Sequence, residues 1–430
     1  MANTQETNIP SLNRALIFLS MSIAGILMTN AHAEQTDLLS SDDFSFDDSA
    51  LSTPEKNISW YNDFKTTLEH SQTQVPGDTQ RQQTSIRLEY ESAFSKGWYA
   101  KIDSRYRYFW HEDDFADREQ GAYGKNKWQQ AWIQYSQDAC VSKLGRQTLI
   151  WGEVEGTFAT DIITPFDYTE QLLTDYSNIR LAQDMLVGEC FFENSQAQLF
   201  LIPEAKIDIY QHSRFYVPIA PTLPPIELTA TPSTEWGGRY KWLGEGFDIS
   251  VMYAKLYGNT PTLIIKGTIP EVDLAHFDLL GVSSSIAYGR LLVKIDASIR
   301  NKQLISQTDS TTDQSDLAVG FEYTTSDNHA INGGIWATHF HEREVVKRKT
   351  QVLTLGWSKT YLNDDLTMSL LGNWFSSPRF SSVNLLSEYQ WDDYWNFSLA
   401  LGLSDVTREA EDLLIAPTKK SLTFGVKFEY

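Results

Sequence analysis

Residues 98–110 read WYAKIDSRYRYFW, and this stretch decides the fold. Side chains of a β-strand point alternately to its two faces, so one face here is apolar and aromatic, while the other carries four ionised groups. A basic group facing lipid at mid-membrane costs about 2–4 kcal/mol, so turning the strand over would cost on the order of 10 kcal/mol. The stretch therefore predicts a transmembrane strand whose polar face lines an aqueous interior.

The same alternation recurs along the chain from about residue 58. Residues 291–300 read LLVKIDASIR, and the last nine residues, 422–430, read LTFGVKFEY. In both stretches apolar side chains occupy every second position, as in a strand with one lipid face. The pattern predicts an all-β protein built as an up-and-down antiparallel barrel, closed so that no strand edge meets lipid.

Turn signals between the strands alternate in length, which indicates how many strands there are. Short connections fall at 94–97, 137–139, 191–195, 244–246, 289–290, 325–328, 363–365 and 391–394. Longer ones fall at about 70–84, 111–127, 153–180, 203–234, 258–280, 301–315, 341–349, 375–381 and 404–420. Tight periplasmic turns and longer outer loops are typical of outer-membrane barrels. Nine long and eight short connections predict about 18 strands (16–18), with both termini on the periplasmic side.

Composition excludes several classes of function. The 430 residues carry a net charge of −21, which argues against a nucleic-acid partner because phosphate binding needs a basic surface. No Gly-x-Ser-x-Gly elbow, Walker-type phosphate loop or zinc-spaced Cys/His cluster occurs. We therefore expect no enzyme activity, no cofactor and no metal. The 13 Trp and 20 Tyr fit a protein with membrane interfaces.

The N-terminal segment has the pattern of an export signal. Residues 15–28 form an apolar run after Arg14, and Ala31-His32-Ala33 offers small residues for cleavage. The run is shorter than the roughly 20 residues of a spanning helix. We therefore expect residues 1–33 to be a cleaved signal peptide, 34–56 an acidic flexible mature N-terminus, and 57–430 an outer-membrane barrel of a Gram-negative bacterium.

Two stretches resemble known families. The C-terminal alternation of Phe424, Val426, Phe428 and Tyr430 resembles the signal that outer-membrane barrels present to the barrel-assembly machinery. This resemblance implies three partners: the barrel-assembly machinery, outer-membrane lipid and lipopolysaccharide.

The second resemblance covers about residues 145–210. The motifs Gly145-Arg146-Gln147 and Trp151-Gly152-Glu153, followed by Asp161, Pro165 and Asp167, are similar to a porin-like family of unknown function that is associated with RND-type exporters. They are more distantly similar to alginate-export barrels. The resemblance implies 18 strands, passage of small or lipid-like organic molecules, and an RND-type exporter as a partner.

Strand parity gives the candidate site residues. The charges expected to face the lumen are Arg87, Glu89, Lys101, Asp103, Arg105, Arg107, Lys294, Asp296 and Arg300. They either create a field that sorts solutes by charge or form cross-strand ion pairs that stiffen the wall. Arg105 and Arg107 are the strongest candidates for the first role, because two like charges stack on one strand.

Two further features concern the long connections. Arg146 either faces the lumen and pairs with a carboxylate of the loop that follows, or fixes that loop structurally; Asp161 and Asp167 are candidate loop anchors. Cys140 and Cys190 lie beside two short turns, where they either form a disulfide or remain free thiols. The proline-containing loop 203–234 is long enough to narrow the mouth.

The sequence thus predicts a porin-like outer-membrane channel that passes small or lipid-like molecules through its lumen. The alternative is a non-conducting structural or interaction barrel that acts through its outer loops.

Overall fold

The computed structural model describes residues 64–112, 123–167, 179–209, 232–267, 269–306, 308–342, 349–377, 379–406 and 420–430. The strands in chain order are β1 (Phe64–Val75), β2 (Asp78–Ser95), β3 (Trp98–Glu112), β4 (Tyr123–Gln137), β5 (Cys140–Gln147), β6 (Gln183–Phe192), β7 (Ser195–Ile202), β8 (Glu235–Gly244), β9 (Phe247–Tyr257), β10 (Thr262–Lys266), β11 (Ile269–Asp273), β12 (His276–Tyr288), β13 (Leu291–Leu304), β14 (Thr311–Thr324), β15 (Ala330–Phe340), β16 (Lys349–Tyr361), β17 (Leu366–Ser376), β18 (Arg379–Gln390), β19 (Trp395–Val406) and β20 (Lys420–Glu429). The predicted signal peptide and acidic N-terminus lie outside the described residues.

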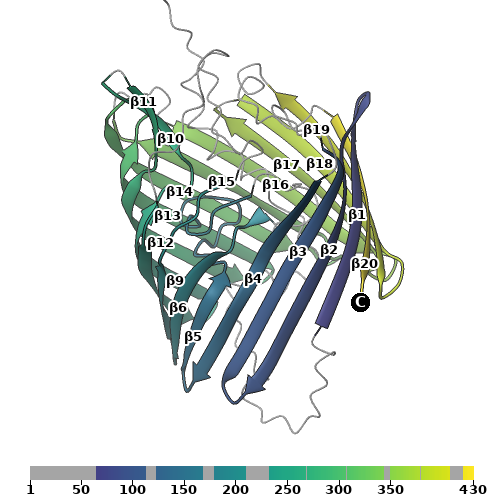
Figure 1. The fold of residues 1–430 in the computed structure, drawn as a ribbon, viewed down its shortest axis with the longest axis horizontal. Coiled ribbons are helices and arrows are strands. Elements are labelled where there is room, and N and C mark those ends of the chain that lie inside the picture. Colours follow the sequence, from purple (N-terminus) through teal and green to yellow (C-terminus); the bar gives the residue numbers. More distant parts are fainter. Residues whose placement is uncertain are drawn as a thin grey trace, which may run out of the picture.

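Eighteen of these strands form one closed antiparallel barrel (Figure 1). Each strand pairs with its neighbour in sequence, except that β9 pairs with β12 and β1 pairs with β20 to close the cylinder. Strands β10 and β11 form a separate hairpin in the connection between β9 and β12. The predicted all-β barrel of 18 strands is confirmed.

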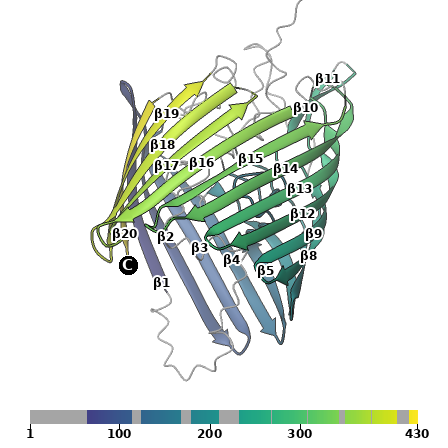
Figure 2. The ribbon, with the colours of Figure 1, turned by 180° about the vertical axis from the view of Figure 1, so that it is seen from behind.

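The strands run between two rims (Figure 2), and at one rim every connection has five residues or fewer. Two predicted long connections at the other rim are wrong: residues 70–84 form the ends of β1 and β2, which are joined by two residues at 76–77, and residues 375–381 form the ends of β17 and β18, which are joined by two residues at 377–378. The end of the β1–β2 hairpin is rich in Gln, Thr and Ser on both faces, so its polarity resembled that of a loop. The predicted loop 111–127 is also too long, because β4 already begins at Tyr123.

The two faces of the wall differ as the alternation predicted. On β3 the outward side chains of Ile102 and Trp110 are 47% and 55% exposed, whereas the inward Arg107 is 0% exposed. A closed cylinder with an apolar exterior hides its ionised groups inside and leaves no unpaired strand edge, which is what hydrocarbon requires. Among the residues described, no helix has the length and apolar character needed to cross a bilayer.

The hydrophobic core lies inside the cylinder, on the face where strand alternation places mostly polar side chains. It consists of residues from the connection between β5 and β6 packed against inward side chains of β6, β7, β9, β12 and β14–β18. We call residues 148–167 the bridge, because they cross the lumen. A disulfide between Cys140 and Cys190 joins β5 and β6 at the rim of tight turns, where the two cysteines are direct register partners.

Candidate functional site

The chain changes direction at Gly145, three residues before the bridge. This residue has a φ of +131°, and a Cβ there would lie 2.4 Å from the carbonyl oxygen of Ala131 on β4. Only glycine tolerates this backbone conformation and this close approach. Strand β5 ends two residues later at Gln147, and the chain then turns into the lumen.

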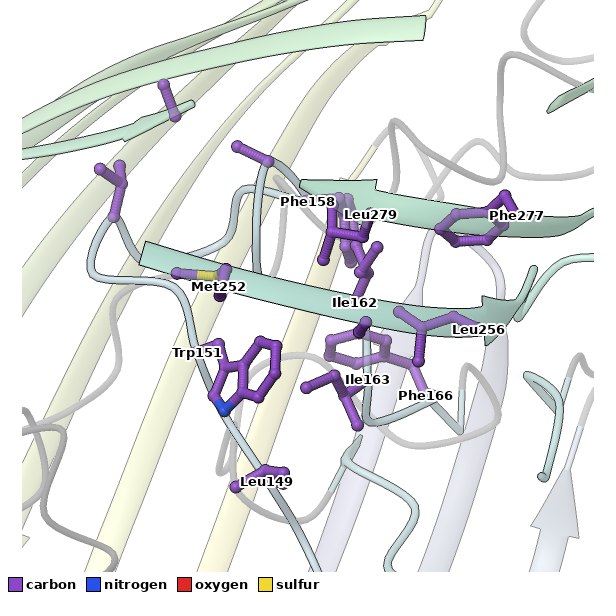
Figure 3. Packing of buried hydrophobic residues seen from close by; sticks show 14 of the residues in the cluster. Leu149, Trp151, Phe158, Ile162, Ile163, Phe166, Met252, Leu256, Phe277 and Leu279 are labelled. Carbon is purple, nitrogen blue, oxygen red and sulfur yellow. The ribbon is translucent and has the colours of Figure 1, made fainter. Parts of the chain in front are cut away.

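Apolar side chains hold the bridge against the wall of β9 and β12 (Figure 3). Trp151 is 0% exposed, and its ring meets Phe200 of β7 edge-on with centroids 5.2 Å apart. Its indole nitrogen donates a 2.7 Å hydrogen bond to Gln198 Oε1, so the polar atom is satisfied inside the core. Further buried bridge residues are Val154, Phe158, Ile162, Ile163 and Phe166.

One end of the bridge is fixed to β13 through its backbone. Asp296 accepts the N–H groups of Glu153 (3.1 Å to Oδ2) and Val154 (2.8 Å to Oδ2). Farther along the same strand, Ser298 and Arg300 donate to bridge carbonyl oxygens. Hydrogen bonds to a charged group contribute about 1.5–3 kcal/mol each, so this is a strong attachment.

Ionised side chains of the bridge also pair with the wall. Glu153 accepts from Lys241 Nζ of β8 at 3.0 Å and from Ser285 Oγ of β12 at 3.1 Å. Glu155 lies 3.3 Å from Lys294 Nζ. Burial raises the pKa of the Glu155 carboxyl above its ordinary value near 4.5, although Lys294 opposes the shift.

The other end of the bridge rests on a basic cluster, which we define as Arg107 of β3 with Lys125 and Lys127 of β4. Asp167 Oδ2 lies 3.3 Å from Lys125 Nζ, 3.7 Å from Lys127 Nζ and 4.0 Å from Arg107. Asp167 is 0% exposed, so these contacts form away from bulk water. Asp167, which the sequence analysis named as a candidate loop anchor, thus lies at the end of the bridge beside these cations.

The two attachments lie almost diametrically opposite. Passing from β3 through β4, β5, β6, β7, β8, β9 and β12 to β13 takes eight steps in a ring of 18 strands, whose half is nine. The inward positions of Gly320 on β14 and Gly334 on β15 leave room for Val154, which lies 3.0 Å from where a Cβ of Gly320 would be. The bridge thus crosses the lumen from one side of the wall to the other.

Arg146 is not where the sequence reasoning put it. Its side chain projects from the outer face of β5 and forms a bidentate pair with Asp184 of β6 (3.0 and 2.8 Å). The reason is parity: β5 directs Lys143 and Gln147 inward, so even-numbered residues point out. The hypothesis of a lumen-facing Arg146 is wrong, and the bridge carboxylate of Asp161 pairs instead with Arg180 (3.1 Å from Nη1).

The remaining predicted lumen charges form cross-strand ion pairs. Arg87 holds Asp103 in a bidentate contact at 2.9 and 2.6 Å and also meets Glu89 at 3.2 Å. Lys101 pairs with Glu91 at 2.5 Å, and Arg105 pairs with Glu69 at 3.0 Å. Arg300 pairs with Asp316 at 3.1 Å. These placements correspond to the wall-stiffening alternative for most of the set.

Another part of the inner wall is polar without being charged. The inward positions of β15, β16 and β17, all of which the structure describes, hold no ionised side chain. We define the hydroxyl strip as the buried hydroxyl and amide residues on the inward faces of β15–β18 and β20: Thr338, Thr350, Thr367, Ser369, Asn373, Ser382 and Thr423. Their side chains both donate and accept hydrogen bonds.

The C-terminal strand presents its alternate aromatic side chains outward. Phe424 is 48% exposed and Tyr430 is 77% exposed, while Val426 and Phe428 are partly covered. Tyr394, in the turn between β18 and β19, stacks near Phe428 and Tyr430. Recognition of this strand by an assembly machinery remains a prediction.

Among the described residues, no group of His, Cys, Asp and Glu could hold a metal ion.

Comparisons with known proteins place the fold. No family model matches the sequence, and no curated protein matches it. Among solved structures, OpdK of Pseudomonas aeruginosa, crystallised with vanillate, has a TM-score of 0.54 at 8% identity, over 86% of this chain and 99% of that chain. OccAB3 of Acinetobacter baumannii has a TM-score of 0.52 at 9% identity, over 85% and 98%. OccD3 of P. aeruginosa has a TM-score of 0.51 at 10% identity, over 86% and 91%. At these identities the likeness establishes the barrel fold alone.

Proposed function

We propose that this chain is an outer-membrane, porin-like channel that passes small polar organic solutes. The observation that carries the proposal is the contrast between the two faces of one closed wall. Its exterior is apolar, and its interior combines ionised groups on β2–β4 with the hydroxyl strip on β15–β18 and β20. An 18-stranded barrel is wide enough to enclose water unless loops block it. The bridge narrows that space, which favours small solutes.

Polar solutes fit this interior better than lipid-like ones. Most of the buried apolar side chains inside the barrel belong to the core that packs around the bridge. The ionised groups of β2–β4 and the hydroxyl strip supply the hydrogen-bonding groups of the interior. A partnership with an RND-type exporter remains a prediction of the sequence resemblance, and co-purification of an inner-membrane protein would test it.

Ion conductance in planar bilayers tests the proposal. The purified full chain should give steady single-channel steps in KCl. Liposomes that contain it should admit a pentose faster than a tetrasaccharide, because the bridge limits the size of the path. A barrel that migrates as folded before boiling, and yet carries no current and admits neither sugar, would contradict the channel and favour the non-conducting alternative.

A further inference from the structure

A lysine lies on the outer face of β9, near the rim of long loops. Val251 and Tyr253 face outward on this strand and are 39% and 42% exposed, and Lys255 is the next outward position. Lys255 is the register partner of Trp236 on β8, whose ring lies 5.8 Å from that of Tyr253. Outward Trp and Tyr side chains mark the depth of the lipid headgroups. The long stem of Lys255 lets its ammonium group reach that level.

The carboxylate opposite Lys255 is bound to neutral donors. Asp278 of β12 is the register partner of Lys255. Tyr253 Oη donates to Asp278 Oδ1 at 2.8 Å, and Asn301 Nδ2 donates to Asp278 Oδ2 at 2.9 Å. Within the described part of the chain, the ammonium group of Lys255 forms no ion pair and no hydrogen bond. Its positive charge therefore remains available to a ligand.

A β-bulge brings a second lysine to the same region. Relative to β14, β13 has one extra residue between Arg300 and Gln303, which are both buried. Regular alternation after Arg300 would direct Lys302 into the lumen, whereas Lys302 is exposed and has a φ of +49°. Residues other than glycine seldom adopt such a φ, and bulges often redirect a side chain. Lys302 also forms no ion pair with any residue that the structure describes, and both lysines act electrostatically on Asp278 and His276.

These residues together form a cationic surface beside aromatic rings at headgroup depth. We define the outer patch as six residues: Tyr253, Lys255, Tyr257, His276, Asp278 and Lys302. His276 stacks on Tyr257 with ring centroids 4.5 Å apart, and the two extend the patch toward the loops. The whole chain has a net charge of −21, so a local excess of positive charge determines where a phosphate can approach.

We propose that the outer patch binds lipopolysaccharide, the phosphorylated glycolipid of the outer leaflet, with the ammonium groups of Lys255 and Lys302 on its phosphates. Ammonium groups bind phosphate as compact charges, and they do so most strongly where no carboxylate competes. The inference is independent of the proposed channel, because the outer patch lies outside the lumen.

Native mass spectrometry of the full chain, refolded in detergent, tests the site by measuring the affinity for diphosphorylated lipid A. Dephosphorylated lipid A is the ligand control. K255Q/K302N should lower the affinity about thirtyfold, since each interfacial cation contributes about fivefold. Asparagine at position 302 tolerates the positive φ, so the bulge is kept. D278N should raise the affinity about fivefold, because it removes the acidic group beside both lysines.

The matched control is K96Q/R290Q, which removes two exposed cations from turns at the opposite rim. This variant should bind diphosphorylated lipid A as the wild type does. Equal affinities of the wild type and folded K255Q/K302N would overturn the proposal. Equal binding of dephosphorylated lipid A or of phosphatidylglycerol by the wild type would also overturn it.

The D278N variant decides if K255Q/K302N does not fold. An affinity of D278N for diphosphorylated lipid A no higher than that of the wild type would then overturn the proposal. Lipid A binding by a barrel that carries no current would contradict the channel alone.

Discussion

Asp296 of β13 accepts the backbone N–H of Val154 at 2.8 Å, although the two residues are 142 positions apart in the chain. The same carboxylate accepts the N–H of Glu153. In the barrel wall, backbone N–H groups donate to neighbouring strands. The bridge forms no strand here, and a buried carboxylate of the wall accepts its N–H groups instead.

Replacing Asp296 by Ala should release this end of the bridge. Two buried N–H groups would lose their acceptor, and each unsatisfied group costs about 1–3 kcal/mol, so bridge attachment should weaken by roughly 2–6 kcal/mol. Limited proteolysis of the folded barrel in detergent should then cut within residues 151–166. S250A is the control, because Ser250 is equally buried on β9 and its hydroxyl has no hydrogen-bond partner among the described residues. Equal protease resistance of D296A and S250A would contradict this role.

Attachment of the bridge should depend on pH through Glu155. Its pKa is raised by burial in the folded protein, so the folded state holds the proton more tightly than the unfolded chain. This group therefore contributes stability below the ordinary value near 4.5, and the contribution is lost as pH rises through the higher folded pKa. Hydrogen exchange of residues 151–166 between pH 4 and 8, corrected for intrinsic rates, should show slower exchange at acidic pH. The difference should shrink in E155Q; an unchanged pH profile in that variant would refute the assignment.

A charged residue on the lipid face of β19 should destabilise the barrel. Leu401 is 43% exposed on the outer face, and L401K should lower the free energy of unfolding by about 2–4 kcal/mol if the residue lies near mid-membrane. The inward Ser398 on the same strand provides the control, since S398K places the same charge in the lumen. Urea titration in lipid vesicles measures both. Equal losses would mean that the two faces of the wall are not distinguished by lipid.

The disulfide should stabilise the pairing of β5 with β6. It closes a segment of 50 residues that includes the bridge. Chain entropy gives an upper bound of about 4 kcal/mol for a loop of that length. Reductant should therefore lower the urea midpoint of the wild type and leave that of C140S/C190S unchanged. A wild-type midpoint that reductant does not move would show that strand pairing alone holds this rim.

Much of the wall could be predicted because lipid excludes charged side chains, and this determines which face of each strand points outward. In Trp98–Trp110 a shift by one residue would expose four charges, so the sequence permits only one orientation. The end of the β1–β2 hairpin escaped prediction, because both of its faces are polar and its Gln and Thr residues resemble those of a loop.

The site was harder to predict, because it depends on contacts between distant segments. Asp167 and Asp161 were recognised as candidate anchors, but their partners Lys125, Lys127 and Arg180 were assigned to connections. The alternate spacing of Lys125 and Lys127 was a usable signal that placed both on one face. The β13 anchor at Asp296 was predicted to face the lumen, yet no pattern indicated that it would accept main-chain N–H groups.

A chain segment tied at two points nearly half a circumference apart has a mechanical consequence. A cylinder held together only by hydrogen bonds between adjacent strands deforms most easily by flattening into an ellipse. The attachments of the bridge at Asp296 and Asp167 resist widening along the line that joins them. Lateral pressure from the surrounding bilayer would therefore change the cross-section least along that diameter.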